Sequence, residues 1–194
     1  GLSGTERPRR QHQALLLLLL VVVATLAPGA RILATFAPPK LISPTVISDN
    51  TPPVLYSDEA LLLSATIKGN LARVSPGELL VVNACWQAAR PMSRDYTVFV
   101  QLLGPDNSII SSRRTYPGLG RFPTSLWPAD RGFCDAYRLT LPADVDTPLR
   151  ALLEIGLFDA TTGERLPAQV DGIVIEPPVV SSVVVAAKTS QALA

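Results

Sequence analysis

One stretch of the chain gathers the side chains best suited to hold a sugar. Tyr116, Arg121, Phe122 and Trp127 lie close together in a segment rich in proline and glycine that ends at Pro128. Aromatic rings offer flat apolar faces with a polar rim, and an arginine donates up to five hydrogen bonds. These four residues are therefore candidate ligand-binding residues. A competing interpretation is that Phe122 and Trp127 close the open end of a β-sandwich.

The two cysteines, Cys85 and Cys134, are the next candidates for chemistry. We expect both to point away from the core, because Trp86 and Tyr137 take the core-facing positions of the same two strands. If the strands are neighbours, a cross-strand disulfide is possible; the alternative is two free thiols acting as small apolar side chains. A catalytic thiol is disfavoured, because the sole histidine, His12, lies in a basic flank far from either cysteine in the sequence.

The composition argues against several other classes of site. One histidine and two cysteines leave almost nothing for a zinc site. The carboxylates are scattered along the sequence, and their spacing does not show the facing pair that a glycosidase needs. We therefore expect no catalytic residue, no metal and no cofactor in this chain. Lys and Arg number 17 against 16 Asp and Glu, a net charge of +1, so no nucleic-acid partner is expected either.

The first 36 residues predict a membrane anchor. A basic flank over 1–13 contains Arg7, Arg9 and Arg10, and an apolar segment over 14–36 follows it. We interpret 14–36 as one transmembrane helix that contacts the lipid bilayer, with the N-terminus cytoplasmic and the rest of the chain extracytoplasmic. The alternatives are a cleaved signal peptide and a buried core helix. The predicted location is the cell membrane.

The rest of the chain has the pattern of a β protein. Residues 37–54 are rich in proline and predict a stiff linker. Short apolar runs then recur between turn signals over 55–176, which is typical of a sandwich, and 165–175 is expected to be its closing strand. Residues 177–194 are expected to be a tail or an added edge strand. The predicted fold is all-β: a two-sheet antiparallel sandwich, immunoglobulin-like or jelly-roll-like, preceded by one transmembrane helix.

An ordered set of motifs in this region resembles a known family. The motifs resemble the extracytoplasmic β domain that follows the last membrane helix of bacterial polytopic glycosyltransferases, which are similar to the dolichyl-phosphate-mannose protein mannosyltransferases of the GT-C type. The residues that carry the resemblance are Pro76-Gly77-Glu78, Trp86, the run from Asp95 to Leu103, Gly120 to Trp127, Asp135 to Pro142 and Gly156 to Pro167.

The resemblance implies a function that this chain does not complete by itself. In such transferases the catalytic acidic residue lies in an early outer loop, a region that this sequence does not contain. We expect a piece of a longer membrane glycosyltransferase, not catalytic alone, that assists in positioning an acceptor or glycan at the membrane surface. One alternative is a self-standing anchored surface module that binds carbohydrate or an envelope protein. A purely structural envelope domain is the other.

Overall fold

The structure, a computed structural model, describes residues 38–46, 52–68 and 73–187. The predicted basic flank and membrane helix, over 1–36, lie outside the described residues, as does the end of the predicted tail. Within the described ranges no helix combines the length and the hydropathy that crossing a bilayer requires. Nearly all of the regular secondary structure in the domain that begins at Pro38 is strand, which confirms the predicted all-β class.

The first sheet is antiparallel throughout, with strand order β10-β9-β1-β2-β4-β7. Its longest strands, β4 and β7, pair over nine positions from Leu79 opposite Thr140 to Gln87 opposite Gly132. The edge of β7 also pairs with Ile42, through reciprocal backbone hydrogen bonds with Gly132. The strands are β1 Val54–Tyr56, β2 Ala60–Ile67, β4 Leu79–Ala88, β7 Gly132–Thr140, β9 Ala168–Val170 and β10 Ile173–Ile175.

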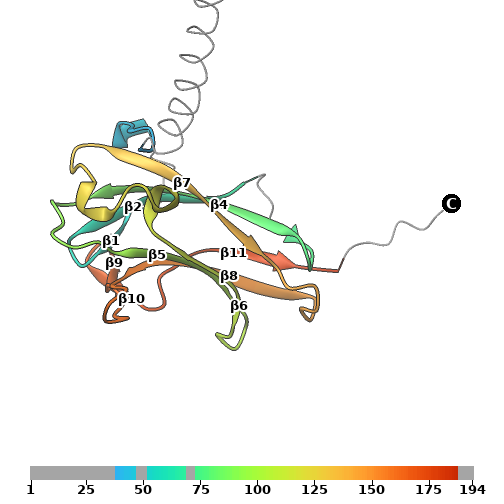
Figure 1. Ribbon diagram of the computed structural model, residues 1–194. Coiled ribbons are helices and arrows are strands. Elements are labelled where there is room, and N and C mark those ends of the chain that lie inside the picture. The colour runs from blue at the N-terminus through green and yellow to red at the C-terminus, as the bar shows by residue number, and fades with distance from the viewer. Residues whose placement is uncertain (1–37, 47–51, 69–72, 188–194) are drawn as a thin grey trace, which may run out of the picture. The chain divides into compact units, whose positions relative to one another are not determined.

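The second sheet has the order β3-β11-β8-β5-β6, and only the pairing of β11 with β3 is parallel. In Figure 1 the sheet that contains β7, β4 and β2 lies above the sheet that contains β5, β8 and β6. The two predicted sheets are thus present among the described residues. The strands are β3 Arg73–Val74, β5 Thr97–Leu103, β6 Ile109–Thr115, β8 Leu149–Phe158 and β11 Val179–Val185.

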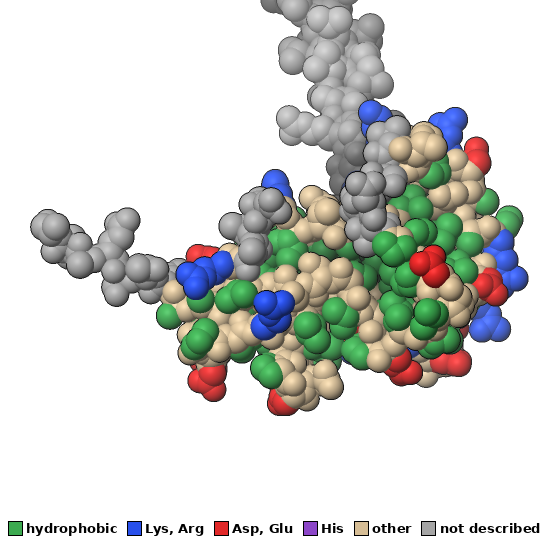
Figure 2. Space-filling model, turned by 180° about the vertical axis from the view of Figure 1, so that it is seen from behind, with side chains coloured by type: hydrophobic (Ala, Val, Ile, Leu, Met, Phe, Trp, Pro, Cys, Tyr) green, Lys and Arg blue, Asp and Glu red, His purple; other side chains and the backbone are tan. Residues whose placement is uncertain are grey.

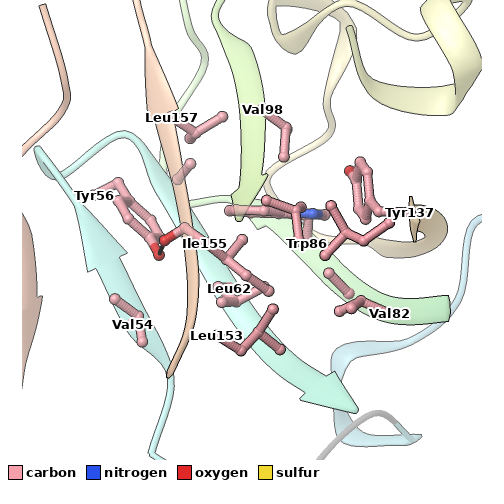
Figure 3. Close-up of a cluster of buried hydrophobic side chains, with 14 of the residues drawn as sticks. Val54, Tyr56, Leu62, Val82, Trp86, Val98, Tyr137, Leu153, Ile155 and Leu157 are labelled. Carbon is pink, nitrogen blue, oxygen red and sulfur yellow. Dashed lines mark hydrogen bonds between the residues drawn. The ribbon is translucent and has the colours of Figure 1, made fainter. Parts of the chain in front are cut away.

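The core lies between the sheets because each long strand alternates apolar residues toward its partner sheet. Trp86 and Tyr137 come from the first sheet, and Val98, Leu153 and Leu157 come from the second; all five are buried. Figure 3 shows these side chains pointing toward one another between the strands that bear them. The alternation leaves every other residue of each strand on an outer face.

Two segments differ from the expectation. The closing strand expected over 165–175 is interrupted, because Asp171 and Gly172 both have positive φ and form a tight turn between β9 and β10. Strand β11 is an interior strand between β3 and β8 and not an added edge strand. Strand β3 pairs with β11 at Val184 and Val185, and the side chains of Val183 and Val185 are buried in the core.

Short helical turns occupy the connections of the described part. They are η1 Pro44–Val46, α2 Pro117–Gly120 and η2 Thr124–Leu126. The last two lie in the long connection between β6 and β7, the segment that contains the predicted ligand-binding residues. The predicted linker is not wholly free of the domain, because Ile42 pairs with the edge of β7.

Two buried tyrosines should make the domain less stable at alkaline pH. Burial raises the pKa of Tyr56 and Tyr137 above the ordinary value near 10, and the Tyr56 hydroxyl donates a 2.7 Å hydrogen bond to the carbonyl of Ile155. Above about pH 10 the unfolded chain loses protons that the folded chain keeps, so the free energy of unfolding should fall by about 1.4 kcal/mol per pH unit for each tyrosine.

Denaturant unfolding between pH 9 and pH 11.5 measures this slope. Tyr56→Phe should remove the share of one tyrosine from the slope, because phenylalanine has no proton to lose. If the dependence of the free energy of unfolding on pH is the same in Tyr56→Phe, burial of Tyr56 does not contribute to the loss of stability at alkaline pH.

Candidate ligand pocket on the outer face of the second sheet

The predicted loop residues do not form one exposed platform. Phe122 is only 5% exposed and Trp127 only 3%. Their rings pack edge-on against Phe133 at centroid distances of 5.0 and 4.8 Å, and Trp127 Nε1 donates a 3.0 Å hydrogen bond to the Phe122 carbonyl. Both rings belong to the core, as the competing interpretation of this segment has it. Their faces are therefore not open to a ligand in this conformation.

The other two predicted residues lie nearer the surface. Tyr116 is 44% exposed, and Arg121 is half-buried with its Nε donating to the Gly118 carbonyl at 3.1 Å. The loop is fixed by Thr124, whose buried hydroxyl donates to the Arg94 carbonyl and accepts from the Tyr96 N–H, both at 2.9 Å. These hydrogen bonds hold the connection in place as a cover for one end of the core.

The cysteines lie directly opposite each other on β4 and β7, with their Cα atoms 4.0 Å apart. A disulfide joins Cys85 to Cys134. It lies on the outer face of the first sheet, because Trp86 and Phe133, the next residues along their strands, point into the core. The disulfide therefore ties two neighbouring strands together outside the core.

The outer face of the second sheet contains an unexpected buried row. Thr97, Phe99, Gln101 and Leu103 alternate with the core residues of β5 and so point outward, yet all four are buried. On the adjacent strand β8, Glu154 pairs with Gln101 in the register and is 1% exposed. A buried outward row requires a cover, and the chain that follows β8 supplies part of it.

That cover is positioned by a tight hairpin over 159–164. Asp159 closes it, since its N–H donates to the Glu164 carbonyl at 2.9 Å and its carbonyl accepts from Gly163 at 2.8 Å. The Asp159 carboxylate also accepts from the backbone N–H of Thr161, which lowers the pKa of this aspartate. After the hairpin Arg165 pairs with Phe158, so its side chain returns over the outer face.

Arg165 joins three buried residues into one cluster. Its Nη1 lies 2.8 Å from Oε1 of Glu154, and its guanidinium carbon lies 4.4 Å from the centre of the Phe99 ring. Gln101 donates from Nε2 to the other oxygen of Glu154. Both carboxylate oxygens of this buried glutamate are thereby paired. Gln101 Oε1 is buried without a hydrogen-bond partner among the described residues.

A glycine makes room for the cluster. Gly156 lies opposite Phe99 in the register, and a Cβ built on it would lie 2.4 Å from Phe99 Cζ. Any side chain at this position would therefore push the ring away from the strand. The ring fills the space that a side chain would take, which is a known way for an aromatic residue to cover a glycine in a sheet.

Beside the cluster lies a small pocket of about 80 Å³. Arg114 of β6 forms one wall, with its guanidinium carbon 5.6 Å from the centre of the Phe158 ring. Arginine N–H donors here lie beside the flat apolar faces of aromatic rings. We call this site the outer-face pocket; it is lined by Phe99, Arg114, Phe158, Gly163 and Arg165.

One residue in the sequence, Gly156, indicates that another group packs closely against its strand, although composition and periodicity do not reveal the pocket. A glycine inside a long apolar strand marks a close approach of another group, and Gly156 is such a residue. Phe99 and Gln101 share the outward parity of their strand, which a simple alternation argument assigns to solvent. The sequence does not predict that the side chain of Arg165 lies over the outer face of the second sheet, because this placement depends on the conformation of the hairpin over 159–164.

Comparisons with known proteins do not assign the chain to a family. No family model matches it, and no curated protein matches it. Among solved structures, alkylpurine DNA glycosylase AlkC of Pseudomonas fluorescens, bound to DNA with an abasic-site analogue, is similar at 10% identity and a TM-score of 0.38. That alignment covers 66% of this chain and 31% of the glycosylase, so this chain spans less than two thirds of the length of that protein.

Two further structures are similar at the same low level. The C-terminal domain of wzt aligns at 12% identity with a TM-score of 0.47, covering 76% of this chain and 88% of that domain. The sporulation control protein Spo0M of Bacillus subtilis aligns at 12% identity with a TM-score of 0.30, covering 67% of this chain and 50% of that protein. Similarities of this size carry no argument about what this chain does.

Proposed function

We propose that this chain is the extracytoplasmic, non-catalytic β-sandwich region of a membrane glycosyltransferase, and that it positions an acceptor or glycan at the membrane surface. In this proposal the sandwich is immunoglobulin-like or jelly-roll-like and follows one transmembrane helix over 14–36. The observation that carries the proposal is the outer-face pocket, where Arg114 and Arg165 lie beside the rings of Phe158 and Phe99.

The construction of the pocket favours binding over catalysis. Glu154 is the carboxylate of the cluster, and both of its oxygens are engaged by Arg165 and Gln101. A glycoside-cleaving site needs two carboxyl groups that face each other across the substrate. A carboxylate held in this way instead fixes the orientation of an arginine, and a fixed arginine suits recognition of a ligand.

The disulfide between Cys85 and Cys134 supports an extracytoplasmic location. Disulfides persist in oxidising compartments and are rare where thiol reductants are abundant. The apolar segment over 14–36 and its basic flank also favour an extracytoplasmic location for the residues that follow. An enzyme that uses a lipid-linked donor would meet its acceptor at the outer surface of the membrane. A binding domain anchored there is in the right place to hold that acceptor.

Glycan binding tests the binding part of this proposal. The 194-residue chain in detergent micelles should bind envelope oligosaccharides on a glycan array. Phe158→Ala should weaken this binding by about tenfold, or about 1.4 kcal/mol, because the stacking surface is lost. Ile109→Ala, an exposed apolar residue of β6, is the matched control and should bind as the unaltered chain does. Loss in Tyr116→Ala with full binding in Phe158→Ala would place the site in the loop instead.

The coding DNA upstream of the Gly1 codon tests the transferase part. A reading frame that continues through several apolar spans, with an acidic residue in the first outer loop, supports a terminal region of a transferase. A start codon immediately upstream would overturn this part and leave the self-standing anchored module, for which the same pocket would serve as the binding site.

A further inference from the structure

The outer-face pocket has an excess of positive charge at its wall. It is lined by two arginines, and the described residues that line it include no acidic side chain. Arg165 is paired with Glu154, whereas Arg114 takes part in none of the ion pairs among the described residues. The two arginines and the one buried glutamate of this cluster therefore sum to a charge of +1.

Each guanidinium is backed by an aromatic ring. Arg165 lies 4.4 Å from the ring centre of Phe99, and Arg114 lies 5.6 Å from that of Phe158. A cation over an aromatic face is held there by the charge distribution of the ring. Arginine keeps its charge at all ordinary pH values and presents paired N–H donors that match the two oxygens of a carboxylate or phosphate.

The wider surface does not supply this charge. Figure 2 shows basic and acidic side chains interspersed over the visible face, without a large field of one sign, and the whole chain has a net charge of only +1. A net charge of this size gives no reason to expect a general attraction of polyanions to the chain. Any preference for an anion has to come from the local arrangement of Arg114 and Arg165.

The size of the pocket limits what enters it. About 80 Å³ is room for a few water molecules. A carboxylate or a phosphate group is small enough to enter this space, which is open to solvent on one side. A sugar ring that bears the group would then lie within reach of the partly exposed Phe158.

From these observations we propose that the outer-face pocket recognises an oxyanion carried by a saccharide, either a carboxylate or a phosphate ester. This inference rests on the proposed function, because it names the class of glycan that the same site takes. The charge of Arg165 is balanced by its ion pair with Glu154, so Arg114 supplies the positive charge that attracts the oxyanion. Phe158 supplies the apolar face for the sugar ring. An acidic glycan should therefore bind more tightly than its neutral counterpart.

The test compares glucose, glucuronate, glucose 6-phosphate and inorganic phosphate, titrated into the full chain in detergent micelles and followed by nuclear magnetic resonance. Glucuronate or glucose 6-phosphate should bind at least tenfold more tightly than glucose, and added salt should reduce the difference. Whichever acidic sugar binds more tightly identifies the oxyanion. Arg114→Ala should lower the affinity for the acidic sugars to the level of glucose. Arg113→Ala is the matched control, since its side chain leaves the other face of the same strand.

The outcomes separate this inference from the function on which it rests. Glucose bound as tightly as the acidic sugars, with binding lost in Phe158→Ala, would overturn the anion inference and leave glycan binding in place. Inorganic phosphate bound as tightly as glucose 6-phosphate would support the anion site and contradict recognition of the sugar. No binding of any of the four would overturn both.

Discussion

Replacing Trp127 with alanine is expected to lower the free energy of unfolding by about 3–5 kcal/mol, because a large aromatic side chain is removed from a packed core. Trp127 is 3% exposed and lies 5.8 Å from Trp86 and 4.8 Å from Phe133, measured between ring centres. Its indole N–H also holds the carbonyl of Phe122. The cavity would open where the connection between β6 and β7 covers the end of the sandwich. Denaturant unfolding of the variant measures the loss.

The neighbouring residues supply the comparison. Tyr116→Ala removes a side chain that is 44% exposed and should change the free energy of unfolding by less than about 1 kcal/mol. A Trp127→Ala variant that melts normally but loses glycan binding would contradict the structural role. It would mean that the indole faces a ligand in solution, as the four-residue site predicted from the sequence requires.

The second large effect is expected at Arg165. Arg165→Ala leaves Glu154 buried with Gln101 as its remaining side-chain partner. A buried carboxylate that has lost its counter-charge is costly, and we expect a loss of about 2–4 kcal/mol, within the range set by unpaired buried charges. The upper part of the range for a fully buried pair is not expected, because Arg165 itself is 49% exposed and water can take its place.

A double substitution separates the charge from the packing. Glu154→Gln removes the buried charge with little change in volume, so Arg165→Ala combined with Glu154→Gln should be more stable than Arg165→Ala alone. The coupling between the two changes, measured by a double-mutant cycle of unfolding free energies, should therefore be favourable. Purely additive effects of the two substitutions would show that the ion pair does not organise the outer face.

Much of the fold could be predicted because alternation is a local signal. Val98, Val100 and Leu102 alternate with Phe99 and Gln101 along their strand, so the sequence shows that they share one face, and the structure has all three in the core. The turn at Asp171 and Gly172 is also a local signal, a pair typical of two-residue hairpin loops. The prediction of one strand over 165–175 does not take this pair into account.

The pocket could not be predicted in the same way. Its residues come from β5, β6, β8 and the hairpin after β8, which are brought together by strand order and not by spacing. Alternation assigns Gln101 and Glu154 to an outer face but does not say that this face is covered. The predicted loop residues present a different ambiguity. An aromatic loop residue has the same sequence signature whether it stacks on a ligand or, as Phe122 does, fills the end of a core.

We propose that this domain binds a glycan at the outer-face pocket. Mapping amide chemical-shift changes in the isotope-labelled chain during titration with glucuronate or glucose 6-phosphate tests it most directly. We expect the largest changes at the residues that line the pocket, which are Phe99, Arg114, Phe158, Gly163 and Arg165. Changes centred on Tyr116 and Arg121, with the pocket unaffected, would contradict it.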